Sequence, residues 1–307
     1  MIAKFFEKYS IQKNDKIVVA CSGWADSMFL LDSILEIHDK NNIIVAHFNH
    51  NLRWEESQWD EEFVISYSNK LWILTEIWSA DIKSTAKEEK IWIEEAARIK
   101  RYSFLEETRK KHWAKYILTA HHLDDSIETF IFNLLRWTKL NWLTWIEEKN
   151  AYILRPLSHI TKSEILAECE MKKIPFRTDS SNADDSYLRN HIRLNIVPEF
   201  DKINPNFRNN LDDLMVYFKE LQIHLEKNSK IIIKEDTHFE ADDFQKLDSF
   251  AQKELIAHIY RVKNSWTIWL TKWNIDEVIR FIKDKWNHTK KEIKNMHLFK
   301  KNWKIYF

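Results

Sequence analysis

The sequence predicts a doubly wound, mainly parallel α/β sheet that is followed by a mostly helical C-terminal domain. The first indication is the continuous apolar run KIVVACS at 16–22, which is typical of a strand buried on both faces of a parallel sheet. The second is that apolar runs alternate with amphipathic segments through the first half of the chain. The third is that this alternation stops near Pro198 and Pro205. We therefore predict two domains, 1–205 and 206–307.

Each expected element has its own signal. Apolar runs predict strands at 16–22, 42–50, 73–78, 114–122 and 151–158. Amphipathic runs predict helices at 26–40, 60–71, 94–112 and 124–136, and then at 209–230, 245–263 and 274–285. The first of these has Met28, Leu31 and Ile34 at helical spacing, and the fourth opens on two aspartates, which suit a positive helix N-terminus. A short β segment at 297–307 closes the chain.

Composition narrows the class of protein. The 307 residues carry 47 basic and 47 acidic side chains, so no global charge favours nucleic acid. No apolar run reaches the length of a membrane span, and the first residues have charges in place of a secretory apolar region. The two cysteines, Cys21 and Cys169, are far apart and form no CxxC, which fits a reducing compartment. We expect a cytoplasmic protein with no membrane contact.

The glycine and tryptophan contents are abnormal. The chain has 1 glycine and 15 tryptophans, whereas glycine makes up about 7% of an average soluble protein. Several tryptophans stand where glycines are expected. Trp113 follows a basic helix end at a C′ position, and Trp303 follows Asn302 where Asn-Gly is the usual hairpin turn. Further examples precede helix-like runs or punctuate a loop, namely Trp59, Trp92, Trp137, Trp142 and Trp145.

This pattern suggests that most of the tryptophans are glycines in the natural protein. The codon UGA is read as glycine in some bacterial codes and as tryptophan in others, so translation with the wrong code would write Trp for a subset of glycines. The alternative is a protein that is truly rich in tryptophan. Mass spectrometry of the natively expressed protein distinguishes the two, because peptides with Trp at position 24 would exclude the recoding hypothesis.

A polar turn follows the first predicted strand. With glycine at position 24 the turn reads S-G-G-x-D-S, and two glycines would let backbone N–H groups form a nest for an anion at a helix N-terminus. A carboxylate facing a phosphate there suggests a Mg²⁺ ligand, Asp26. The alternative is an ordinary strand–turn–helix connection, and no G-K-[ST] of a Walker loop follows. The residues of this candidate anion site are Ser22, Gly23, Trp24, Ala25, Asp26 and Ser27.

The S-G-G-x-D-S pattern resembles the PP-loop of the N-type ATP pyrophosphatases, which have a Rossmann-like fold and cleave ATP to AMP and pyrophosphate. Further motifs at 47–53, 119–138, 155–169 and 177–200 make the chain similar to the bacterial tRNA(Ile)-lysidine synthetases. The similarity runs almost continuously from residue 16 to about residue 205. The helical remainder resembles that family's first C-terminal domain only loosely, and the chain ends before the additional domain of longer members, as in a short form.

The resemblance implies a reaction and its site. ATP adenylates the C2 oxygen of the wobble cytidine in a tRNA(Ile) with a CAU anticodon, and the ε-amine of free L-lysine then displaces AMP to leave lysidine. Asp125 and Glu128 lie three residues apart on one helix face, suited to hold an ammonium group. By the resemblance they bind lysine with Arg101, and they are catalytic together with Asp26. His122 and Asp124 are expected to orient substrate or metal; helix capping is the alternative for the acidic residues.

Other residues are expected to face the tRNA. They are His50, Arg53, Arg155, Asn182, Arg189, Asn190 and Arg193. Arginine suits phosphates and base edges, whereas the alternative for the later arginines is an internal network with Asp179, Asp184 and Asp185. For His50 and Arg53 the alternative is a polar loop. The lysine-rich segment 283–304 would add salt-sensitive phosphate attraction, or is a solvated face.

Two other functions stay open at this stage. One is a different PP-loop tRNA-modifying enzyme, although a thiolase that moves sulfur through cysteines needs a thiol pair and this chain has no CxxC. The other is a non-catalytic tRNA-binding relative, which would follow if Trp24 is literal, because its side chain would crowd the pyrophosphate. The expected ligands are ATP, Mg²⁺, L-lysine and tRNA(Ile), and a homodimer is left open.

Overall fold

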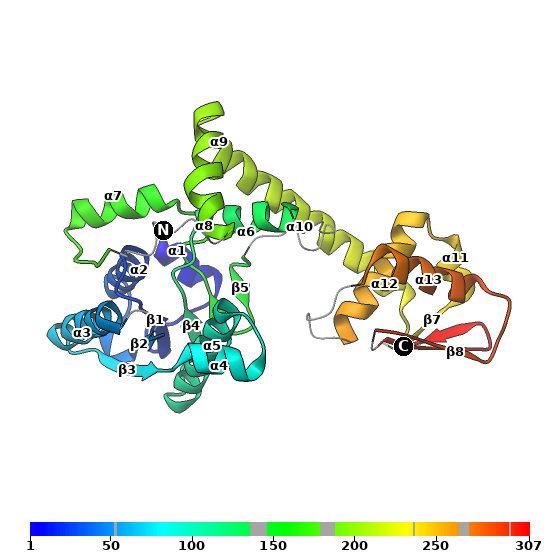
Figure 1. The fold of residues 1–307 in the computed structure, drawn as a ribbon, viewed down its shortest axis with the longest axis horizontal. Helices are drawn as coiled ribbons and strands as arrows, with labels where there is room; N and C mark the ends of the chain where they lie inside the picture. The colour runs from blue at the N-terminus through cyan, green and yellow to red at the C-terminus, as the bar shows by residue number, and fades with distance from the viewer. Residues whose placement is uncertain (52–53, 136–145, 179–187, 236, 264–269, 295) are drawn as a thin grey trace. The chain divides into compact units, whose positions relative to one another are not determined.

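The computed structural model describes residues 1–51, 54–135, 146–178, 188–235, 237–263, 270–294 and 296–307. The chain divides into two compact units, Met1–Met215 and Val216–Phe307 (Figure 1). The division lies inside the long helix α10 (Phe207–Ile232), a little beyond the predicted end of the first domain at residue 205. Among the described helices, none is both long and apolar enough to cross a membrane.

The first unit is built on a six-stranded sheet with the order β3-β2-β1-β4-β6-β5. The strands are β1 (Ile17–Ala20), β2 (Ile43–Asn49), β3 (Leu74–Ser79), β4 (Tyr116–Leu118), β5 (Lys149–Asn150) and β6 (Ile153–Leu154). β1 pairs in parallel with β2 and β4, β2 with β3, and β4 with β6, whereas β5 runs antiparallel to β6. The prediction of a doubly wound, mainly parallel sheet is therefore confirmed.

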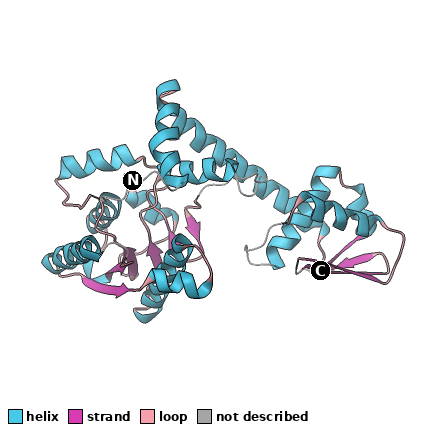
Figure 2. Cartoon of the chain, in the orientation of Figure 1, coloured by secondary structure: helices cyan, strands magenta, loops and turns pink. Residues whose placement is uncertain are grey.

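Helices cover both faces of this sheet (Figure 2). They are α1 (Ile2–Lys8), α2 (Ala25–Leu35), α3 (Trp54–Leu71), α4 (Ile82–Glu89), α5 (Ile93–Lys111), α6 (Leu123–Leu135) and α7 (Lys162–Lys172). Alternate residues of β1 serve the two faces, because successive strand side chains point in opposite directions. Ile17 and Val19 pack in a cluster with α1, α2, α3 and α7, whereas Val18 packs with α4 and α5.

Several predicted boundaries change in the structure. The expected strand at 151–158 shortens to the two residues of β6, because the chain turns at Pro156 and then enters the loop before α7. The strand expected at 114–122 shortens to β4, and its polar end becomes the loop before α6. Helix α1 was not predicted, although Ile2, Phe5 and Phe6 have helical spacing and are buried in the core.

Short helices lead from this unit into α10. They are α8 (Leu188–His191), a π-helical turn (Ile192–Ile196) and α9 (Val197–Ile203). Pro198 stands in the first turn of α9, directly after the π-helical turn, so its missing N–H falls where the hydrogen-bond pattern of the helix changes. Pro198 therefore lies within a helical stretch near the predicted boundary, and Pro205 lies between α9 and α10.

The second unit combines helices with a four-stranded antiparallel sheet of order β7-β10-β9-β8. Its elements are β7 (His238–Glu240), α11 (Ala241–Lys246), α12 (Ser249–Lys263), α13 (Lys272–Lys283), β8 (Thr289–Ile293), β9 (Met296–Lys301) and β10 (Lys304–Tyr306). Helices α12 and α13 and the closing strands were predicted, but α11, β7 and β8 were not. The signal of the two strands is weak because β7 is three residues long and β8 reads TKKEI, which has a single buried apolar residue, Ile293.

Among the tryptophans that the structure describes, three adopt the left-handed backbone conformation. The φ angles are 59° at Trp72, 57° at Trp113 and 62° at Trp303. Trp72 and Trp113 follow the ends of α3 and α5, and Trp303 follows Asn302, whose φ is 49°, in the β9–β10 turn. Positive φ is a genuine outlier for a bulky residue and is routine for glycine. The predicted cap position of Trp113 and the predicted turn position of Trp303 are both confirmed.

The other tryptophan predictions have mixed outcomes. Trp92 is the N-cap of α5, as expected of a residue just before a helix. The prediction for Trp59 is wrong, because α3 begins at Trp54 and Trp59 lies inside it; two glutamates in the first turn let the helix start earlier. The predictions for Trp137, Trp142 and Trp145 fall outside the described residues.

We expect the substitution Trp113→Gly to stabilise the protein by about 1 kcal/mol, because glycine removes the steric cost of the left-handed conformation. Trp113 is 90% exposed, so little packing is lost. The matched control is Trp59→Gly in the same unit, which should destabilise by about 1 kcal/mol because it places glycine inside a helix. Urea unfolding of both variants measures the two changes. Equal signs would show that backbone strain is not what distinguishes the two positions.

Candidate active site at the carboxyl edge of the sheet

The loop between β1 and α2 contains the chain's one glycine at a position that requires it. Gly23 has a φ of +89°, and a Cβ atom there would meet the side chains of Phe63 and Val64 at 3.3 Å. The carbonyl of Gly23 accepts a hydrogen bond from the N–H of Arg177 at 3.0 Å. Backbone conformation and close packing therefore both demand glycine at this bend.

The serine hydroxyls of the loop hold it in shape. The hydroxyl of Ser27 donates to the carbonyl of Trp24 at 3.0 Å. A hydroxyl has one hydrogen, so the 3.1 Å contact between the two serines has Ser22 as donor and Ser27 as acceptor. Ser27 also accepts from the N–H of Ser22 at 3.1 Å, and the N–H of Trp24 reaches the hydroxyl of Ser22 at 3.4 Å. The loop is thus preorganised by its own side chains.

Trp24 does not itself need the conformational freedom of glycine. It is the N-cap of α2, with φ −86° and ψ 164°, which any residue adopts. Its indole Nε1 donates to the Asp60 carboxylate at 3.4 Å, and Arg177 Nε donates to the other oxygen of Asp60 at 2.6 Å. The bend of the loop is at Gly23, so any requirement for glycine at position 24 comes from the approach of a ligand.

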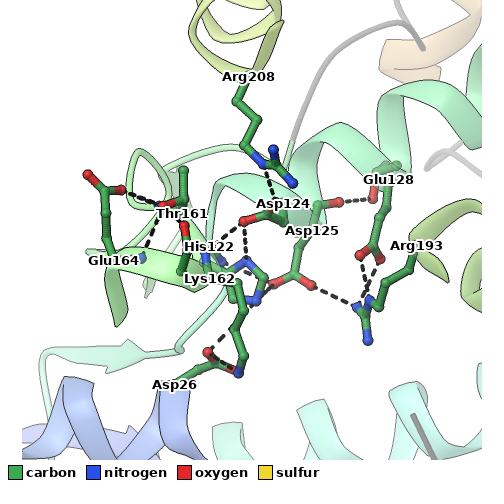
Figure 3. Close-up of polar contacts among 12 residues, drawn as sticks. Asp26, His122, Asp124, Asp125, Glu128, Thr161, Lys162, Glu164, Arg193 and Arg208 are labelled. Carbon is green, nitrogen blue, oxygen red and sulfur yellow. Dashed lines mark hydrogen bonds and ion pairs between the residues drawn. The ribbon is translucent and has the colours of Figure 1, made fainter. Parts of the chain in front are cut away.

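Asp26 lies in the first turn of α2 and faces Lys162 and His122 (Figure 3). Lys162 Nζ donates to Asp26 Oδ1 at 2.6 Å, and His122 Nε2 is 3.9 Å from the same oxygen. Lys162 is the first residue of α7, and His122 precedes α6. The first turn of α7 therefore meets the first turn of α2 at this carboxylate.

Asp124 joins the starts of α6 and α7 to α10. Its Oδ2 accepts the backbone N–H of Lys162 at 2.7 Å, and its Oδ1 accepts Nε of Arg208 at 2.7 Å. Burial by itself raises the pKa of Asp124, but the hydrogen bonds from Arg208 and Lys162 outweigh burial and hold the pKa below the ordinary value. The Asp124 carboxylate is therefore charged. It holds the starts of α6 and α7 to α10 in addition to lining the site.

Asp125 and Glu128 converge on one guanidinium group, that of Arg193 (Figure 3). Arg193 donates to both oxygens of Glu128, at 2.6 and 2.9 Å, and lies 3.6 Å from Asp125. The N–H of His122 also donates to Asp125 at 3.0 Å. Burial raises the pKa of Glu128, whose side chain is 2% exposed, and the hydrogen bond from Arg193 offsets only part of that rise.

Two arginines, Arg101 and Arg155, lie near His121. Burial lowers the pKa of His121 well below its ordinary value, and the charges of Arg101 and Arg155 lower it further. Arg101 comes from α5, and its guanidinium lies 5.3 Å from the ring centre of Tyr102. Arg155 is 5% exposed and donates to the carbonyl of Glu147. His121 is therefore neutral near pH 7, beside two permanent positive charges.

The residues expected to face tRNA lie in different places. His50 follows the end of β2, with its ring centre 4.6 Å from that of Phe48. Arg189 Nη2 donates to Thr129 at 3.1 Å, and Asn190 lies beside it in α8. Arg155 is buried, and Arg193 is hydrogen-bonded to Glu128 although its side chain is 36% exposed. The predictions for Arg53, Asn182, Asp179, Asp184 and Asp185 fall outside the described residues.

The residues of the site fit a Mg²⁺ ion that takes most of its ligand atoms from a bound nucleotide. Within the described ranges, no group of three or more His, Cys, Asp and Glu side chains is arranged to bind a metal. Asp26 nevertheless offers carboxylate oxygen, the donor that Mg²⁺ prefers, and the ammonium of Lys162 at 2.6 Å shows that a cation is accommodated there. One carboxylate together with phosphate oxygens is the usual way in which Mg²⁺ is bound with a nucleotide.

Sequence reasoning missed Lys162 and Arg208. The signal for Lys162 was present, because T-K-S-E at 161–164 is a capping box and therefore marks a helix start. The structure contains that capping box, with Thr161 and Glu164 bonded to each other's backbone N–H groups. For Arg208 no local pattern exists, since it reaches Asp124 from 84 positions along the chain.

The family model of the PP-loop domain matches residues 1–200. The chain belongs to the PP-loop family. The match covers the whole parallel sheet, the loop at 22–27 and every other site residue described above except Arg208. The predicted PP-loop identity, and with it the use of ATP by this type of domain, is confirmed.

Several curated relatives of this chain are named tRNA(Ile)-lysidine synthase. The protein from Bacteroides thetaiotaomicron is 40% identical over 212 residues, which are 68% of this chain and 49% of that protein. Those from Borrelia garinii and Bacillus cereus are 33% and 31% identical, and cover 86% and 91% of this chain and 60% and 62% of their own lengths. The predicted resemblance is confirmed, although the chain spans only about half to three-fifths of the length of these relatives.

A solved structure shares the PP-loop fold. The tRNA thiolase NcsA from Methanococcus maripaludis superposes with a TM-score of 0.58 at 15% identity, and the match covers 72% of this chain and 76% of that one. At this identity the similarity shows the fold alone. It agrees with the mainly parallel sheet of the first unit.

We expect Asp124→Asn to destabilise the protein by about 1–3 kcal/mol at neutral pH, because two charge-assisted hydrogen bonds weaken. A group with a lowered folded pKa contributes stability above its unfolded value and loses it as the pH falls through the folded value. The difference in the free energy of unfolding between the parent protein and Asp124→Asn should therefore disappear below pH 3.8. Urea unfolding between neutral pH and about pH 3 measures it. The control Asp201→Asn removes a more exposed partner of Arg208 and should lower stability by less than about 1 kcal/mol; a larger loss there would contradict the assignment.

Proposed function

We propose that this chain uses ATP to ligate free L-lysine to C2 of the wobble cytidine of a tRNA(Ile) with a CAU anticodon. The observation that carries the proposal is the meeting of Asp125 and Glu128 on one cationic group beside the PP-loop. Two carboxylates that hold a guanidinium can also hold the ammonium of a lysine substrate. The names and identities of the curated relatives support the same reaction.

The first step is adenylation of the cytidine. Its C2 oxygen attacks the α-phosphorus of ATP, the α–β phosphoanhydride bond breaks, and pyrophosphate leaves. The bend at Gly23 and the N-terminus of α2 direct backbone N–H groups to the phosphates. Asp26 is the residue that would hold Mg²⁺, which supplies positive charge to the leaving pyrophosphate.

The second step is attack by lysine. The substrate's ε-ammonium must lose a proton, after which its nitrogen forms a bond to C2 and the C2–O bond breaks to release AMP. A raised pKa makes Glu128 a stronger proton acceptor than an exposed carboxylate, which suits it to receive this proton. Arg101, from α5, is the proposed partner of the lysine carboxylate.

The tRNA is proposed to bind through His50, Arg189 and Asn190 of the first unit and through the lysine-rich strands of the second. Residues 283–304 include the whole of β8 and β9, each of which exposes a lysine. Such contacts release counterions, so binding should weaken as the salt concentration rises. These contacts would position the tRNA, whereas recognition of the wobble base requires side chains that contact the base itself.

Sulfur transfer is disfavoured as the alternative PP-loop chemistry. Cys21 and Cys169 are both buried, and they are the only cysteines in the sequence. Burial raises the pKa of both thiols, that of Cys169 to about 11, so neither forms a reactive thiolate near neutral pH. The second candidate is a non-catalytic tRNA-binding relative. It is favoured by the bulk of Trp24, whose side chain occupies space beside the loop and is hydrogen-bonded to Asp60.

The residue at position 24 decides between these two functions. We expect a version with Trp24→Gly to incorporate radiolabelled lysine into a tRNA(Ile) transcript with ATP present. The version with Trp24 should be slower by at least about 100-fold, because the indole ring displaces the phosphates from the loop. Lysine incorporation and release of AMP and pyrophosphate measure both versions.

The control for this experiment is Trp113→Gly, the same substitution at an exposed position after α5. It should leave the activity of either version unchanged. A transcript with uridine at the wobble position should accept no lysine. A Trp24→Gly version that binds ATP and tRNA and still incorporates no lysine would defeat the proposed function.

A further inference from the structure

We propose that Lys162 is a phosphate-binding residue of the site, whose ammonium moves from Asp26 to the pyrophosphate portion of ATP. This inference rests on the proposed use of ATP at the PP-loop. The geometry that points to it is the position of Lys162 Nζ, 2.6 Å from Asp26 Oδ1 at the start of α2. A lysine ammonium is a compact charge on a flexible stem and a frequent partner of phosphate.

The backbone of Lys162 is fixed, whereas its side chain can move. The N–H of Lys162 donates to Asp124 at 2.7 Å, and the capping box of Thr161 and Glu164 fixes the first turn of α7. Ile165 and Cys169 bury the inner face of the same helix in the core. The side chain of Lys162 is nevertheless 39% exposed, so its tip remains at the surface of the site. A rigid base and a movable tip allow the ammonium to change partners.

The loop itself leaves a need for positive charge. The hydroxyls of Ser22 and Ser27 are already bonded within the loop, at 3.1 and 3.0 Å. Asp26 adds a negative charge beside the place where phosphates would bind. If Asp26 held Mg²⁺ together with ATP, the ammonium of Lys162 would lose its partner next to a new group of anionic oxygens. Transfer of the ammonium to those oxygens satisfies both charges.

A purely structural role for the Lys162–Asp26 pair explains less. An ion pair with a partly exposed lysine contributes little to stability, and α7 is already held by its capping box, by Asp124 and by its apolar face. The chain contains a matched example of a structural pair. Lys172, at the other end of α7, pairs with Glu36 after α2 at the same close range, 2.7 Å, but away from the PP-loop.

The test compares Lys162→Gln with Lys172→Gln in the Trp24→Gly version of the full chain, with MgATP and AMP as titrants in calorimetry. We expect Lys162→Gln to weaken MgATP binding by roughly 10- to 100-fold, the value of a charged hydrogen bond, and AMP binding by less than about twofold, because AMP lacks the pyrophosphate. Lys162→Arg should retain most of the ATP affinity. Lys172→Gln should change neither affinity.

The remaining outcomes overturn the inference in distinct ways. Unchanged MgATP affinity in Lys162→Gln, or equal losses for MgATP and AMP, would show that Lys162 does not contact the pyrophosphate. A drop in melting temperature larger than that of Lys172→Gln, with unchanged affinity, would assign Lys162 a structural role. A parent protein that binds MgATP but makes no lysidine would defeat the proposed function and leave this comparison valid. A parent that binds no ATP would defeat both.

Discussion

The carboxylate of Asp124 is the contact on which the arrangement of the site depends. It accepts the first N–H of α7 and the guanidinium of Arg208, and it stands itself at the start of α6. The first N–H groups of a helix have no partner inside the helix, so a carboxylate at that point both satisfies α7 and fixes its direction. Because α7 begins there, Lys162 meets Asp26. The same turn of α6 places Asp125 and Glu128 before Arg193.

The carboxylates of the site are paired with cations of the chain itself. Asp26 is paired with Lys162, Asp124 with Arg208, and Glu128 with Arg193. A buried carboxylate without a counter-charge would be strongly disfavoured, so these pairs keep the site stable before substrates bind. Cationic substrates and Mg²⁺ would then enter by exchange with charges already present. Because one positive charge would replace another, the total charge of the site would change little. Each carboxylate would then keep a cationic partner when a substrate binds.

The tryptophans show where local pattern and backbone geometry agree. Trp113 and Trp303 were assigned to glycine-like positions from their neighbours, and their φ angles of 57° and 62° are those that glycine adopts most easily. Trp24 differs, because its backbone is ordinary and the bend belongs to Gly23. The argument for glycine at position 24 is therefore about space for phosphates, whereas at positions 113 and 303 it is about backbone strain.

The sequence by itself determined the parallel sheet, the PP-loop and the acidic turn of α6, because each is written in contiguous residues with a local periodicity or motif. It did not predict β7 or β8, whose short or polar sequences become strands only by pairing with β9 and β10. Only the tertiary structure decided that Lys162 faces Asp26 and that Arg193 faces Glu128, across 136 and 65 positions of sequence. Such contacts depend on how helices pack, and no local pattern records that packing.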